Sequence, residues 1–234
     1  MNGRVLYIYA IPAATVFVVV AIGGALIWWP LALLSIPLAA LAVFVMWKRA
    51  GESLLRSLGA RRLGQTEGQR VLNTVENLCL ASGIPQPNVM TVDTDACNVG
   101  TVSGTEDTLI VTTGLLEAFD LMEMEGVLAH ALTKLSNGSS KYSTLAASAR
   151  PFITKGQLKK VAEWGSGDAG VASYDISGVG LTKYPPGLRS ALERIAGRST
   201  DVSGGEPLGD AWFVPPSADD EQLGKRIEML WELS

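Results

Sequence analysis

Residues 123–134 read Glu123-Met124-Glu125-Gly126-Val127-Leu128-Ala129-His130-Ala131-Leu132-Thr133-Lys134, and this stretch decides the fold. Its apolar residues, followed by Leu135, recur at the spacing of one face of a helix. We therefore predict a buried central helix over 121–135. The stretch also carries the single histidine of the chain, so a histidine-rich metal site is excluded by count.

The same stretch has the frame of the H-E-x-x-H motif, in which two histidines one helical turn apart bind zinc and the glutamate acts as general base. His130 fills the first ligand position, but Ala131 stands at the glutamate and Lys134 at the second histidine. A catalytic zinc needs three protein ligands plus water. We therefore predict no catalytic residue, no metal and no cofactor in this degenerate motif.

Length, net charge and cysteine spacing limit the kinds of protein that this chain can be. With 234 residues the chain is long enough for one ordinary domain plus a membrane segment. Its net charge of −4 gives no reason to expect nucleic acid as a partner. Cys79 and Cys97 form no C-x-x-C pair, and Cys79 lies on the apolar face of a predicted helix, where it acts as a small buried residue.

The N-terminal part has no charged side chain between Val5 and Trp47. Residues 5–29 are long enough to span a bilayer, and 31–47 form a second apolar run after Trp28-Trp29-Pro30. We predict a two-helix transmembrane hairpin over residues 1–47, ahead of a single span or a re-entrant pair. A signal peptide is disfavoured because a second hydrophobic run follows directly.

Positive charge flanks this hairpin at both ends. Arg4 precedes it, and Lys48, Arg49, Arg56, Arg61 and Arg62 follow, against Glu52 alone. The positive-inside rule then places both termini and the globular domain in the cytoplasm, at the plasma membrane. We expect residues 48–65 to be a basic juxtamembrane linker that meets anionic lipid headgroups, although a solvated basic helix describes the same residues.

The rest of the chain, 66–234, is predicted to be a mainly helical α+β domain with a small sheet. Helices are expected at 66–82, 113–120, 121–135, 173–181, 188–195 and 219–233, and strands at 88–92, 96–102 and 108–112. Residues 136–140 suggest a loop, and the stretch to 170 is weakly patterned, with one short helix carrying Lys155, Lys159 and Lys160. In the Gly/Pro/Ser-rich span 199–217, Trp212 and Phe213 suggest a docking point.

Several segments together resemble one family. They are Leu78–Pro87, Ala96-Cys97-Asn98, Val111–Leu116 with Glu125–His130, Leu181–Pro185 with Ser190–Ile195, and Lys225-Arg226-Ile227. In this order they resemble the HtpX-like (M48) membrane zinc metallopeptidases, and the resemblance runs from about Val71 to Leu230. It implies a zincin-like fold, a membrane anchor and a zinc endopeptidase activity.

The departures from the family fall at its zinc site. Counted back from Leu181, the third ligand, a glutamate in the family, falls on Val171, and the aspartate of the same motif falls on Asp175. The family's downstream histidine falls near Asp219 or Asp220. The second pair of hydrophobic spans that HtpX carries is absent. The resemblance therefore supports the fold and the anchor, and the departures argue against the activity.

Three residues carry structural hypotheses. Asp175 is expected to be the partner that orients His130, since a carboxylate commonly holds a ligating histidine in such sites. Lys134 either reaches toward the vacated metal position or lies in solvent. Asn98 marks a strand that either accepts an extended peptide by edge addition or is an ordinary sheet edge.

The function predicted from these residues is that of a membrane-anchored, catalytically inactive pseudopeptidase acting as a binding, scaffold or regulatory subunit. Its expected partners are the lipid bilayer and proteins, either an active homologue or another membrane complex. The alternative is a divergent zinc-dependent membrane endopeptidase that borrows ligands from a neighbouring chain. A plain structural subunit without peptide binding is a third interpretation.

Overall fold

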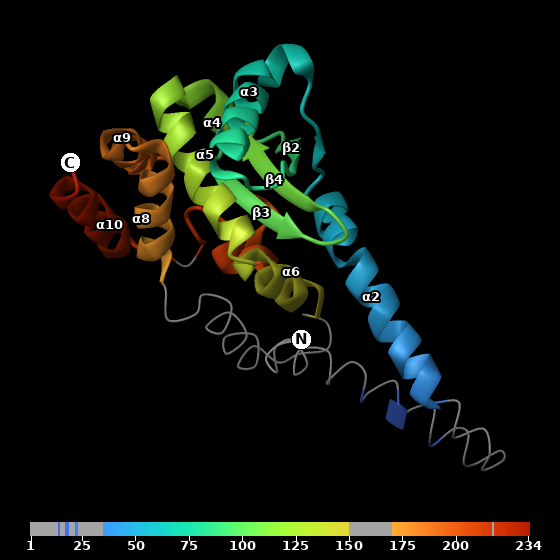
Figure 1. Ribbon diagram of the computed structural model, residues 1–234. Helices are drawn as coiled ribbons and strands as arrows, with labels where there is room; N and C mark the ends of the chain where they lie inside the picture. The colour runs from blue at the N-terminus through green and yellow to red at the C-terminus, as the bar shows by residue number, and fades with distance from the viewer. Residues whose placement is uncertain (1–13, 15–16, 19–21, 23–34, 150–169, 217) are drawn as a thin grey trace.

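The computed structural model describes residues 14, 17–18, 22, 35–149, 170–216 and 218–234. Figure 1 shows a small sheet packed among helices, with the long helix α2 extending away from the rest of the domain. The described elements are α2 (Ser35–Ser57), β1 (Arg61–Arg62), α3 (Gln65–Ser82), β2 (Asn88–Val92), β3 (Val99–Ser103), β4 (Asp107–Thr112), α4 (Thr113–Ala118), α5 (Leu121–Ser136), α6 (Ser139–Ala149), α8 (Val171–Thr182), α9 (Pro185–Ile195), η3 (Glu206–Ala211) and α10 (Asp220–Glu232).

The described strands form one mixed sheet in the order β1-β2-β4-β3. β2 and β4 are parallel, whereas β3 is antiparallel to β4, with Gly100 opposite Ile110. β4 lies inside the sheet, and its Leu109, Ile110 and Val111 are fully buried, which explains why it reads as a continuous apolar run. The predicted α+β class with a small sheet is confirmed. β3 begins at Val99, three residues later than predicted.

The predicted central helix is α5, and it lies in the middle of the domain (Figure 1). A capping box starts it: the Asp120 side chain accepts the Glu123 N–H, and the Glu123 side chain accepts the Asp120 N–H. From Val127 to Leu135 every residue is buried. Because no face of this part of α5 meets water, its polar side chains need partners inside the protein.

Two glycines let other helices approach α5 closely. A Cβ on Gly126 would lie 2.7 Å from the backbone nitrogen of Leu188 in α9. A Cβ on Gly178 of α8 would lie 2.9 Å from the backbone nitrogen of His130. Gly178 weakens the sequence-based prediction of α8, yet it is the residue that allows α8 to pack directly against His130.

Helix α6 is a correction to the sequence-based prediction, which had a loop at 136–140 followed by weak patterning. Among its described side chains, α6 buries Ala147 and several hydroxyl-bearing residues, Ser139, Ser140, Ser143 and Thr144. Ser140 donates to Thr101 of β3 at 2.7 Å, and the Thr144 hydroxyl accepts the Ser103 N–H at 2.9 Å. A helix buried by serine and threonine shows little hydrophobic periodicity. The predicted short helix at Lys155–Lys160 lies outside the described residues.

Helix α2 runs without interruption through most of the predicted second span and through the first part of the predicted linker. Its last turns dock on the domain, because Ala50 and Leu54 are buried, as is Leu58 just beyond the helix. No helix in the described part of the chain has both the length and the apolar character needed to cross a membrane. Most of the predicted first span lies outside the described residues, so the hairpin and its domain boundaries stay predictions.

The docking point predicted in the Gly/Pro/Ser-rich span is confirmed. Trp212 and Phe213 are each 1% exposed and follow the short helix η3. The Trp212 indole N–H donates to the Gly205 carbonyl at 2.8 Å, and the indole ring packs against Gly100 of β3, where a Cβ would lie 2.7 Å from the ring. The segment is irregular, but it is part of the core.

Candidate functional site

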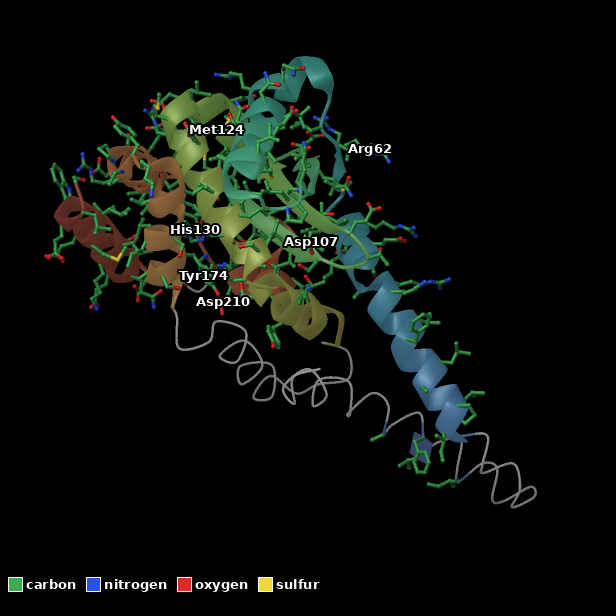
Figure 2. All side chains as sticks on the ribbon, viewed as in Figure 1. Arg62, Asp107, Met124, His130, Tyr174 and Asp210 are labelled. Carbon is green, nitrogen blue, oxygen red and sulfur yellow. The ribbon has the colours of Figure 1, made fainter. Side chains whose placement is uncertain are left out.

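The candidate site is centred on His130 in α5 and Asp175 in α8, both fully buried. His130 Nδ1 lies 2.7 Å from Asp175 Oδ1. Figure 2 shows His130 and Tyr174 close to the contact between α5 and α8, with Asp210 nearby. The structure thus brings together the histidine and the aspartate that the sequence singles out as partners.

Arg226 of α10 completes this pair. Its Nε donates to Asp175 Oδ2 at 2.7 Å and its Nη2 to Oδ1 at 2.8 Å, a two-pronged arrangement that matches guanidinium to carboxylate geometry. Its Nη1 donates to the Phe213 carbonyl at 2.9 Å, and the guanidinium lies 4.6 Å from the centre of the Phe213 ring. Arg226 therefore connects α10, α8 and the segment at Phe213.

Lys134, one helical turn after His130, is also inside the protein and only 3% exposed. Its Nζ donates to the backbone carbonyl of Asp210 and, at 3.3 Å, to that of Trp212. The ammonium also lies 5.7 Å from the centre of the Tyr174 ring. The alternative of a solvated Lys134 is therefore wrong: the side chain points inward and is held by the segment around η3.

Burial and neighbouring charges set the protonation states of this cluster. Burial lowers the pKa of His130 to about 4, against the opposing hydrogen bond from Asp175. Burial alone would raise the pKa of Asp175, but the charge of Arg226 and the contact with His130 outweigh it and lower the value to about 2. Burial lowers the pKa of Lys134 to about 8. At neutral pH the site thus holds a neutral imidazole, one carboxylate and two cations.

These protonation states assign the imidazole tautomer. Because Asp175 is ionised and can only accept, Nδ1 of His130 carries the proton. Nε2 then presents a lone pair, and it is buried without a hydrogen-bond partner in the described structure. The aromatic rings of Phe213 and Tyr174 stand edge-on to the imidazole, at 4.9 and 6.0 Å between ring centres. His130 is therefore enclosed mainly by apolar groups.

The residues present do not fit the zinc ion that an H-E-x-x-H frame would hold. His130 offers one lone pair, whereas the second ligand position carries the Lys134 ammonium and the Asp175 carboxylate is engaged by Arg226. Val171, at the first position of α8, has no donor atom, and Ala131 supplies no group to accept a proton from water. Among the described residues, no group of three or more His, Cys, Asp or Glu side chains is placed to hold a metal.

Asn98 lies inside the protein, directly before β3, and a peptide added at this strand edge stays a prediction. Asn98 is fully buried, and its Nδ2 donates to the carbonyls of Thr200 and Val214 at 2.9 and 2.8 Å. Its Oδ1 accepts the N–H of Val214 at 3.2 Å. A peptide added to β3 would need the backbone groups of that strand, and the Val99 carbonyl already accepts the Phe213 N–H at 2.7 Å.

Sequence reasoning missed three members of the site, namely Arg226, Tyr174 and Phe213 in its role beside His130. One signal for Arg226 exists in the sequence. Leu223, Arg226 and Leu230 fall on one face of α10 at helical spacing, and all three are buried. A lone arginine within an apolar stripe indicates a buried anionic partner, because charged residues are seldom buried unpaired.

The chain's single imidazole should titrate far below its ordinary range, and ¹⁵N NMR of a histidine-labelled sample would show one unambiguous signal. We expect a midpoint near 4 in place of 6.5, with the Nδ1–H tautomer above it. The unfolded chain takes up this proton at higher pH than the folded one. The stability that neutral His130 contributes is therefore complete above pH 6.5 and is lost as the pH falls toward about 4.

Asp175 acts in the same direction in a lower window, from 3.8 to about 2. A His130→Asn variant serves as the control, since the difference between its pH–stability curve and that of the wild type isolates the histidine. A titration midpoint at or above 6.5 would show that the imidazole is not buried as described.

Fold and site together define a class: a mainly helical α+β domain built around a buried helix that carries the frame of a zinc-binding motif with His130 as its single histidine. No family model matches the chain. It is similar to proteins named Protease HtpX homolog, with 33% identity to one from Bacteroides fragilis over 50% of this chain and 32% of that protein. Identity is 27% to one from Dictyoglomus thermophilum, over 65% of this chain and 62% of the relative.

A third relative of the same name, from Desulforapulum autotrophicum, is 25% identical over 80% of this chain and 61% of its own length. The chain therefore spans between about a third and just under two thirds of these curated relatives. Several such matches support a relationship of the chain to the HtpX-like (M48) family.

Proposed function

We propose that this protein is a membrane-anchored, catalytically inactive relative of the M48 peptidases that serves as a binding, scaffold or regulatory subunit of a membrane complex. One observation carries the proposal: the position of the second zinc ligand holds a buried ammonium that is already hydrogen-bonded to two backbone carbonyls. A full ligand set stabilises structural zinc by about 10–16 kcal/mol at neutral pH. One imidazole beside a cation supplies only a small part of this binding free energy.

The anchor is supported by the part of α2 that stands clear of the domain (Figure 1). Ile36, Leu38, Leu41, Phe44 and Val45 are exposed there, spread over more than one face of the helix. Apolar side chains exposed on more than one face of a helix suit a lipid environment. With the basic residues that follow, we place the domain and both termini on the cytoplasmic side of the plasma membrane.

The alternative is a divergent zinc-dependent endopeptidase that completes its site with ligands from another chain. One observation favours it: His130 Nε2 is buried, carries a lone pair and has no hydrogen-bond partner. Against it, an ion at Nε2 would lie near the Lys134 ammonium and the Arg226 guanidinium, both of which act electrostatically on His130. The inactive reading needs no additional chain and is the one we adopt.

Metal analysis of the full-length protein, purified without chelators, tests the proposal. We expect substoichiometric zinc and no shift of the single imidazole NMR signal when zinc is added. A Lys134→His variant is the matched control, since it restores two imidazoles one helical turn apart and should take up more zinc at the same free concentration. Stoichiometric zinc in the wild type, or cleavage of casein that disappears in His130→Ala, would reinstate the endopeptidase.

A further inference from the structure

The outer edge of β3 is covered by a segment of the same chain, Asp210–Val214, which we call the strap. The strap forms an antiparallel bridge with β3 between Trp212 and Gly100. The Phe213 N–H donates to the Val99 carbonyl at 2.7 Å, and the Thr101 hydroxyl donates to the Ala211 carbonyl at 3.1 Å. β3 is the end strand of the sheet, so the strap lies where an added peptide strand would lie.

Two polar side chains hold the ends of the strap. At its C-terminal end, Asn98 both donates to the carbonyl and accepts the N–H of Val214, at 2.8 and 3.2 Å. At its N-terminal end, Lys134 of α5 donates to the carbonyls of Asp210 and Trp212. The strap is therefore fixed to the strand beside it and to the central helix beneath it.

We propose that the strap is an internal peptide that closes the edge of β3, and that Lys134 is the positioning residue that holds it there from the place of the missing zinc ligand. This inference rests on the proposed function, because it takes the Lys134 ammonium as a permanent part of a site that binds no metal. In this proposal the residue at the second ligand position has a structural role: it holds the strap over the edge of β3, where a peptide could otherwise bind.

Because Lys134 is charged, its role in holding the strap can be told apart from a general contribution to the stability of the fold. Burial holds the pKa of Lys134 at about 8, so the charged form is disfavoured inside the protein. The groups that act on it are Asp210 and Asp175, which attract the ammonium, and Arg226, which repels it. Replacing a buried charge by an apolar residue of similar size is often neutral for overall stability. Replacing Lys134 by an apolar residue should therefore loosen the strap locally while changing the stability of the whole protein little.

Hydrogen exchange of the full chain in detergent micelles tests this, with Lys134→Met against wild type. We expect the amides of Phe213 and Val214 to exchange about tenfold faster or more in the variant, because the strap loses two hydrogen bonds from a charged donor. The thermal midpoint should move by only a few degrees. Lys134→Gln keeps a neutral donor and should restore part of the protection.

Lys225→Met is the matched control, since Lys225 is an exposed lysine that pairs with Glu221 on the same helix. It should leave exchange in the strap unchanged. Unchanged protection of Phe213 and Val214 in both Lys134→Met and Lys134→Gln would overturn the inference while leaving the proposed function intact. Zinc in the wild type would remove the proposed function, and it would be detected separately by metal analysis.

Discussion

Replacing Arg226 by methionine is expected to lower the free energy of unfolding by about 3–5 kcal/mol, one of the two largest effects in this protein. The substitution keeps an apolar side chain of similar length in α10 but leaves the Asp175 carboxylate buried without the guanidinium that accounts for two of its hydrogen bonds. It also frees the Phe213 carbonyl. Equilibrium unfolding by denaturant, followed by circular dichroism, measures the change.

The neighbouring Lys225 provides the comparison, since Lys225→Met removes an exposed charge and should change stability by no more than about 0.5 kcal/mol. Removing both charges with Asp175→Leu and Arg226→Met together should recover part of the loss, because the carboxylate is then no longer buried without its guanidinium partner. The recovery should be incomplete, because His130 Nδ1 loses its acceptor and the Lys134 ammonium loses a nearby negative charge. If Arg226→Met were as stable as Lys225→Met, the buried pair described here would be wrong.

Trp212→Ala is expected to cost about 3–5 kcal/mol through the cavity it leaves. The indole fills the space between Gly100 of β3 and Gly205, and its N–H is bonded to the Gly205 carbonyl. It belongs to a buried cluster that includes Leu54 and Leu58, at the end of α2, and Ile110 of β4. Its loss should therefore loosen the attachment of α2 as well as the strap, measured by hydrogen exchange in both segments.

Trp231 is the matched control for this second prediction. Its side chain is 59% exposed on α10 and lies over the Arg189 guanidinium at 3.7 Å. Trp231→Ala removes the same number of atoms but leaves no internal cavity, so we expect a loss below about 1 kcal/mol. Comparable losses for the two tryptophans would contradict the placement of Trp212 in the core.

The buried cluster joins three helices and the strap through side chains of the chain itself. The Asp175 carboxylate of α8 is engaged by Arg226 of α10 as well as by His130 of α5. Lys134 of α5 donates to the backbone of the strap. These hydrogen bonds and charge pairs hold the helices and the strap together at one place.

The local sequence pattern was sufficient to predict the helices and strands that bury one apolar face. The helices over 66–82 and 121–135 and the strands at 88–92 and 108–112 were predictable because packing against a core imposes a period of 3.6 or 2 on the sequence. α6 was not predicted, because its buried face includes hydroxyl groups whose partners, Thr101 and Ser103, are far away in the chain. Such pairing leaves no periodic signal.

What the sequence by itself determined is the central helix, the class of fold and the loss of the zinc ligands, because these follow from which side chains stand at which spacing. Only the tertiary structure decided that Arg226 joins Asp175, that Lys134 turns inward to the strap, and that Asn98 is closed off by Val214. These contacts link residues between 51 and 116 positions apart. A hydrogen bond over that separation depends on how the helices and the sheet meet in space, and no local pattern records it.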